Sequence, residues 1–278
     1  MLKTDITRWI GKQQSHDGRL GDDIAAMLHT TLRDDELPSP RTGDVVPPLW
    51  HWAAFTQKLP MSQIADDGHP HRGDFLPPVA LPRRMWAGGR VDFHAPLHIG
   101  TALRQTSTIR DVVEKSDTMV FVTVHHEIHQ DSQLCLSEDH NIVYLEIPDR
   151  FSPPAPRPVP ASADFVHAAP LSALRLFRYS AATFNGHRIH YDLDYAREVE
   201  KYPGLVVHGP LQATLMLQAA MSHAGRSPAT FTYRGVHPIF HTDDLHIFGQ
   251  ETATGMTVCT GIPEAHQGMQ ATVTWKES

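Results

Sequence analysis

The strongest structural signal in this sequence lies at residues 211–225, which read LQATLMLQAAMSHAG. Apolar side chains recur on nearly every face of this segment, and Gly225 ends it, as expected for a helix that is buried all round. Segments that favour strands follow, at residues 229–236, 244–251, 254–262 and 269–276. A buried helix followed by antiparallel strands predicts a sheet wrapped round one central helix, which is an α+β architecture.

The first half of the chain repeats this logic less clearly. Residues 102–115, 118–130 and 140–148 are rich in Val, Ile and Thr, and short polar turns separate them. We interpret these segments as an antiparallel meander. Residues 1–45 carry weak helical patterning. Two related units are therefore expected.

A proline-rich stretch separates the two halves. Residues 152–162, SPPAPRPVPAS, hold five prolines among eleven residues. Proline cannot donate the hydrogen bonds that a sheet requires, and it favours an extended linker. The predicted domains are therefore residues 1–151 and 163–278, joined by this linker.

Between the linker and the buried helix, the sequence predicts a strand and loop over residues 174–192. A short helix is expected at 192–202, with Asp192 as a plausible N-cap and Pro203-Gly204 as its end.

The overall charge and the cysteines exclude several classes of protein. With 24 Lys and Arg against 31 Asp and Glu, the net charge is -7, which argues against a nucleic-acid partner but not against a small anionic ligand. Cys135 and Cys259 lie far apart, so neither a disulfide framework nor a zinc site is expected. The polar N-terminus and the lack of a long apolar run predict a cytoplasmic protein with no membrane segment.

Histidine is unusually frequent, with 20 copies. The clusters His69-Pro70-His71 and His125-His126 could indicate metal binding, but we favour a pair in a loop and a pair in a strand. Because the sequence shows no phosphate-binding loop, nucleophile elbow or carboxylate-rich metal motif, we expect no cofactor and no catalytic metal.

Residues 178–216, RYSAATFNGHRIHYDLDYAREVEKYPGLVVHGPLQATLM, resemble the hydratase motif of the MaoC-like hot-dog family. That motif runs aromatic, four residues, Ser-Gly-Asp, any residue, Asn-Pro-Ile-His, any residue, Asp. Anchored on His190, it places Tyr179 on the leading aromatic residue, Asn185 on the catalytic Asp and His187 on the Asn. The N-terminal segment LPRRMWAGGRVDF, residues 81–93, resembles the degenerate half of two-domain members. The resemblance implies a double hot-dog fold, a homo-oligomer and an acyl-CoA thioester substrate.

The resemblance also implies roles for the motif residues. Hydration of an enoyl thioester requires removing a proton from water, protonating Cα and stabilising negative charge on the thioester oxygen. His190 is suited to proton transfer near neutral pH. The backbone N–H of Gly209, at the start of the buried helix, is expected to bind the oxyanion, and one such donor contributes about 3–4 kcal/mol.

Asn185 departs from the family pattern, because an amide cannot act as a base. We expect Asn185 to orient the water through its amide oxygen and to leave proton transfer to His190. His187 either shares the base role or hydrogen-bonds the loop. Asp192 does not replace the missing carboxylate, since its position suits a helix cap.

Within the family, LPRRMWAGGR looks most like the two-domain hydratases of C5-dicarboxylic metabolism. This implies hydration of itaconyl-CoA, through mesaconyl-C4-CoA, to citramalyl-CoA. Arg84 and Arg90 are the candidates for binding the free carboxylate, and His208 and Tyr179 complete the expected substrate-binding set. The N-terminal half is expected to have lost its catalytic pair and to shape the acyl pocket.

Three alternatives stay open at this point. The chain could dehydrate 3-hydroxyacyl groups on an acyl carrier protein, which would favour a long apolar tunnel without an internal arginine. It could bind acyl-CoA without catalysis, although keeping both His190 and His208-Gly209 argues against decay. It could also be a thioesterase, which would release free thiol.

Overall fold

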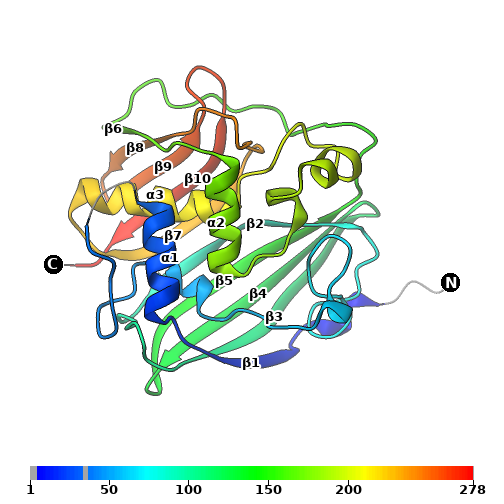
Figure 1. Cartoon of the computed structure of the whole chain (residues 1–278), viewed down its shortest axis with the longest axis horizontal. Helices are drawn as coiled ribbons and strands as arrows, with labels where there is room; N and C mark the ends of the chain where they lie inside the picture. The colour runs from blue at the N-terminus through cyan, green and yellow to red at the C-terminus, as the bar shows by residue number, and fades with distance from the viewer. Residues whose placement is uncertain (1–4, 34–36, 278) are drawn as a thin grey trace.

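The computed structural model describes residues 5–33 and 37–277, so parts of the predicted N-terminal helical region, at 1–4 and 34–36, lie outside the described residues. All strands join one ten-stranded antiparallel sheet, in the order β1-β3-β4-β5-β2-β7-β10-β9-β8-β6. Figure 1 shows helices α1 and α2 side by side in front of this sheet, while α3 lies against the C-terminal strands.

The strands span Gln13–Gly18 (β1), Arg83–Phe93 (β2), Leu103–Ser116 (β3), Met119–Gln130 (β4), Gln133–Leu145 (β5), Phe165–Ala168 (β6), Pro228–Gly235 (β7), His246–Thr252 (β8), Gly255–Gly261 (β9) and Gln267–Trp275 (β10). The helices span Asp22–Leu32 (α1), Ala173–Thr183 (α2) and Gly209–Ala224 (α3). Short helical turns span Ile6–Trp9 (η1), Trp50–Ala53 (η2), Met61–Gln63 (η3), Arg188–His190 (η4) and Tyr195–Val199 (η5, a π-helix).

Each half of the chain supplies five neighbouring strands. Strands β1 to β5 come from the N-terminal half and β6 to β10 from the C-terminal half. Strands β3 to β5 and β7 to β10 correspond to the predicted segments, whereas β1, β2 and β6 were not predicted. The two sets are joined where β2 pairs with β7, with Gly88 opposite Arg234 and Asp92 opposite Thr230. The prediction of two related sheet-and-helix units is confirmed.

The glycines of β2 serve this junction. A Cβ at Gly88 would lie 2.4 Å from the backbone oxygen of Tyr233, and one at Gly89 would lie 2.2 Å from that of Asp139. Glycine is therefore needed for close packing between strands at these positions.

Helix α3 is the buried helix that the sequence predicts. Leu211, Met216 and Leu217 are almost completely buried, and the helix packs on β7 to β10. It ends at Gly225, whose φ of 63° is left-handed and suits glycine.

Helix α2 corrects the prediction of a strand and loop over 174–192. Ser172 caps it by accepting a hydrogen bond from the backbone N–H of Arg175. The buried guanidinium of Arg175 donates to the carbonyls of Thr31 and Leu32, at the end of α1. This contact with a distant helix is a tertiary interaction, which the local alternation of apolar residues does not reveal.

The segment between β5 and β6 contains no helix or strand, in keeping with its prolines, while the exact domain boundaries stay a prediction. Cys135 and Cys259 are buried and free. Among the helices that the structure describes, none has the length and hydropathy needed to cross a membrane.

Candidate active site

A cavity of about 1750 Å³ lies where the two halves meet, and it brings together most of the predicted site residues. The C-terminal half contributes Tyr179, Asn185, His187, His190 and Gly209 to its lining. The N-terminal half contributes a second set of polar and aromatic side chains, among them His69, Arg84, Trp86, His126, Glu138 and His140.

His190 is held in one orientation by the backbone. It ends the short helix η4, and its Nδ1–H donates to the carbonyl of Val206 at 2.7 Å. Because the proton sits on Nδ1, the Nε2 atom of the neutral ring is an acceptor. Burial lowers the pKa of His190 to about 4, so the ring is neutral at pH 7 and is ready to take a proton.

His208 lies behind His190. The two rings stack with centroids 3.7 Å apart, and His208 Nε2 is 2.8 Å from Ser180 Oγ. His208 is fully buried and is absent from the cavity lining. His208 thus lies behind the cavity wall and packs against the candidate base His190, while its expected part in binding substrate stays a prediction.

Asn185 shapes the loop that precedes the base. Its Oδ1 accepts a hydrogen bond from the backbone N–H of His187 at 3.0 Å. One lone pair of this oxygen is therefore used within the loop and is not available to orient water. The amide nitrogen remains as a donor toward the cavity. His187 is buried, and burial holds its pKa well below the usual range, so it is a neutral neighbour of His190.

Gly209 and Tyr179 line the cavity as predicted. Gly209 is the first residue of α3, where the backbone N–H has no acceptor within the helix. A Cβ at this position would lie 2.6 Å from the Trp86 ring, so glycine allows the N-terminal half to close over the helix start. Burial raises the pKa of the Tyr179 phenol, which the Thr214 hydroxyl contacts by a hydrogen bond, and Tyr179 therefore stays protonated.

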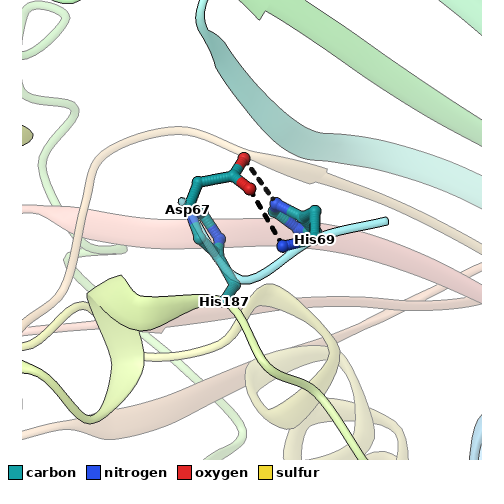
Figure 2. A group of neighbouring side chains, drawn as sticks. All are labelled: Asp67, His69 and His187. Carbon is teal, nitrogen blue, oxygen red and sulfur yellow. Dashed lines mark hydrogen bonds and ion pairs between the residues drawn. The ribbon is translucent and has the colours of Figure 1, made fainter. Parts of the chain in front are cut away.

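Two residues of the site were missed by sequence reasoning. The loop before β2 carries Asp67 and His69, which lie against His187 (Figure 2). The carboxylate of Asp67 accepts from His69 Nδ1 and from the His69 backbone N–H, each at 2.9 Å. The paired histidines at 69 and 71 were the available signal, but nothing in the sequence joins this loop to the motif more than a hundred residues later.

The two candidate arginines lie in different places. Arg84 lines the cavity, is partly buried, and forms no ion pair with any residue that the structure describes. Arg90 is exposed on the surface, where its guanidinium pairs with Asp92 at 2.6 Å. The structure thus brings Arg84 to the site and leaves Arg90 outside it.

A bulge in β2 explains the difference. Trp86 pairs with Ile142 and Gly88 with Asn141, so β2 contains one extra residue between these pairs. In a regular strand Arg84 and Arg90 would point to the same face, because side chains alternate with a period of two. The extra residue reverses that alternation and turns Arg90 toward solvent.

A second group of ionisable side chains lies in the part of the cavity that the N-terminal half of the chain forms. Glu138 is fully buried between His51, at 3.1 Å, and His140, at 2.7 Å, and the Trp52 indole N–H also donates to it. These histidines hold the pKa of Glu138 well below its usual range against the opposing effect of burial. His126, Glu138 and His140 have ligand atoms within 4.8 Å of one another, as do Asp67, His69 and His187. Both sets could geometrically accommodate a metal ion.

A neutral histidine that can serve as a base and a helix N-terminus that can bind an oxyanion thus line one cavity between the two halves, an arrangement suited to hydro-lyase chemistry. Residues 49–241 match the family described as hydroxyacyl-thioester dehydratase type 2. The chain belongs to this MaoC-like family, whose members are enoyl-thioester hydratases and dehydratases.

Individual relatives agree with this assignment. The chain is 38% identical over 284 residues to the mesaconyl-C(4)-CoA hydratase of Chloroflexus aurantiacus, which covers 98% of this chain and 99% of the relative. The MaoC-like dehydratase of Phytophthora capsici superposes with a TM-score of 0.74 at 12% identity, covering 99% of each chain. A Mycobacterium tuberculosis protein described as a double hot-dog fold superposes with a TM-score of 0.59 at 14% identity, covering 96% of each chain. The fold is a double hot-dog.

Proposed function

We propose that this enzyme hydrates a short branched dicarboxylic enoyl-CoA, converting itaconyl-CoA through mesaconyl-C4-CoA to citramalyl-CoA. The observation that carries the proposal is Arg84. Its partly buried guanidinium lines the cavity and is hydrogen-bonded to Tyr144, but it forms no ion pair among the described residues. An anion in the cavity would therefore offset the cost of its desolvation. A free carboxylate on the substrate would supply that anion.

The relative from Chloroflexus aurantiacus supports the same substrate class. That protein is described as a mesaconyl-C(4)-CoA hydratase, and its similarity to this chain extends over both halves. Mesaconyl-C4-CoA carries its free carboxylate on Cβ, the carbon that water attacks. An arginine that binds this carboxylate would therefore also fix the electrophilic carbon near the base.

The chemistry needs two proton transfers for each step. Itaconyl-CoA has its double bond between Cβ and Cγ, so a base removes a proton from Cα and a proton is delivered to Cγ. This gives the conjugated mesaconyl-C4-CoA. In the hydration step, water loses a proton as its oxygen bonds to Cβ, electrons move onto the thioester oxygen, and Cα then takes up a proton as the thioester re-forms.

A substrate panel tests the proposal. Wild-type enzyme and Arg84→Gln would be assayed side by side on mesaconyl-C4-CoA and on crotonyl-CoA, which has no second carboxylate. Loss of one partner of a buried charge pair costs roughly 3–5 kcal/mol, so KM for mesaconyl-C4-CoA should rise at least about 100-fold. Arg90→Gln is the matched control, because Arg90 lies on the same strand but outside the cavity.

Two outcomes would contradict the proposal. Equal losses on both substrates would mean that Arg84 has a structural role or contacts the CoA moiety. A wild-type preference for long neutral acyl chains would favour the second candidate, a 3-hydroxyacyl dehydratase. That candidate is supported by apolar side chains that line the N-terminal part of the cavity, namely Phe75, Leu76, Phe121 and Ile142.

A further inference from the structure

The C-terminal motif does not supply a carboxylate to its own base. Asp192 is engaged elsewhere, because its Oδ2 accepts from the Arg188 guanidinium and its Oδ1 accepts from the backbone N–H of Tyr195. Asn185 is uncharged. Hydration takes a proton from water and delivers a proton to Cα. A second proton-transfer group beside His190 would divide these two tasks, and the N-terminal half of the cavity is where a carboxylate-supported one lies.

The N-terminal half provides a histidine with the same arrangement as His190. The Nδ1–H of His69 donates to Asp67 Oδ2 at 2.9 Å, just as that of His190 donates to the Val206 carbonyl at 2.7 Å. In both rings the neutral form therefore carries its lone pair on Nε2. His69 lines the cavity, while Asp67 stands behind it outside the lining.

The loop that carries this pair is fixed to the catalytic loop. The backbone N–H of Arg188 donates to the carbonyl of Asp67, and the Arg188 guanidinium donates to that of Asp66, both at 3.0 Å. Gly68, with a φ of 89°, packs so closely that a Cβ would lie 1.8 Å from the carbonyl oxygen of Gly186. The position of His69 is thus tied to that of η4, the helical turn that ends at His190.

His187 lies between the two histidines. Its ring centroid is 4.2 Å from that of His69 and 5.3 Å from that of His190. Figure 2 shows His187 reaching the Asp67–His69 pair from the other half of the chain. All three imidazoles line one cavity. A substrate in this cavity can therefore contact His69, which Asp67 orients, and His190, which the Val206 carbonyl orients.

We propose that His69 is the second proton-transfer residue of the hydration reaction, and that Asp67 is the positioning residue that fixes its orientation. One of His69 and His190 takes the proton that water loses when its oxygen bonds to Cβ. The other starts the cycle as an imidazolium and delivers its Nε2 proton to Cα as the enolate returns to the thioester. A proton then passes through solvent from the first ring to the second, which restores the starting state, and in the dehydration direction the same transfers run in reverse.

The surrounding charges favour this role over a metal site. The Arg84 guanidinium acts electrostatically on Asp67, His69 and His187 alike, and a cation beside these side chains opposes the binding of a dication. Burial and then Arg84 lower the pKa of His69, with a smaller effect from Arg72, while Asp67 raises it. His187 faces the same ring as a neutral group.

The experiment compares His69→Ala, Asp67→Asn and the control His94→Ala, which changes an exposed histidine of the N-terminal half outside the cavity lining. The inference rests on hydratase activity, so each variant is assayed on the thioester that the wild-type enzyme hydrates fastest in the substrate panel. This choice separates a failure of the inference from a wrong assignment of the substrate. We expect kcat to fall at least about 100-fold for His69→Ala, the usual size of a general acid–base contribution.

Further measurements distinguish proton transfer from a structural role. Added imidazole should raise the activity of the His69→Ala enzyme at least about tenfold. Asp67→Asn should lower kcat with little change in KM, and it should shift the limb of the pH profile that reports His69 to lower pH, because Asp67 raises that pKa.

Three results would overturn the inference. The first is a His69→Ala enzyme that keeps more than about a tenth of wild-type kcat. The second is an Asp67→Asn enzyme with wild-type kcat and an unchanged pH profile, which decides the matter even if His69→Ala does not fold. The third is wild-type activity that is lost on chelation and restored by Zn²⁺, because the cluster would then be a metal site.

Discussion

The imidazole rings of His190 and His208 stack with their centroids 3.7 Å apart and their planes 20° from parallel. Burial lowers the pKa of both rings, and the neighbouring His190 lowers that of His208 further. Two buried stacked imidazoles cannot both carry charge at low cost. Burial therefore holds His190 neutral, the stack restricts its ring, and the Val206 carbonyl sets its tautomer.

Substitution of His190 by alanine should abolish hydration and leave the fold intact. The ring supplies a proton acceptor at the cavity, and removal of such a group costs at least about 100-fold in turnover. The loss would be measured by the change in enoyl absorbance, with thermal unfolding as the control for folding. Turnover above about a tenth of the wild-type value in a folded His190→Ala enzyme would exclude His190 as a proton carrier.

Substitutions at Asn185 should distinguish the role of its amide oxygen from that of its amide nitrogen. Asn185→Asp keeps an oxygen to accept from the His187 backbone N–H, so the loop should persist and activity should be retained or increased. Asn185→Ala removes both this acceptor and the amide donor, and kcat should fall at least about tenfold. Steady-state kinetics on the two variants provide the comparison. If Asn185→Ala behaves like the wild type, the alignment of the motif on His190 has to be shifted.

Much of the architecture could be read from local patterns. The buried helix α3 and the strands that follow it were predicted close to their observed bounds, because each segment has an apolar pattern suited to one kind of element. Helix α2 was not, since its aromatic and apolar residues resemble a strand until Arg175 is seen to bind the end of α1. Contacts between distant segments decided its structure.

The site residues also fall into those that the sequence predicted and those that it did not. Tyr179, Asn185, His187, His190 and Gly209 line the cavity and follow one another within a single stretch of sequence. Asp67 and His69 were missed because a loop from the other half brings them to the motif, and no local pattern encodes that contact. Arg84 and Arg90 looked equivalent, since the bulge that separates them depends on how β2 pairs with its neighbours.

The buried histidines should make the protein less stable in acid. Burial lowers the pKa of His190 to about 4, and burial together with His140 lowers that of His126 to about 3, while those of His187 and His208 lie well below the usual value. Unfolded histidine titrates near 6.5. Between about pH 6.5 and 4 the unfolded chain therefore binds more protons than the folded chain, and the free energy of unfolding must fall as the pH falls.

Urea unfolding at several pH values between 7.5 and 4.5 measures this effect. Because each pKa unit is worth about 1.36 kcal/mol, His190 alone accounts for roughly 3 kcal/mol over the full window. His190→Gln should lose correspondingly less stability on acidification than the wild type, and His16→Gln, which changes an exposed side chain, is the matched control. A wild-type protein that gains stability between pH 6.5 and 4.5 would mean that these histidines are charged in the folded state, and His190 could then not serve as the base at neutral pH.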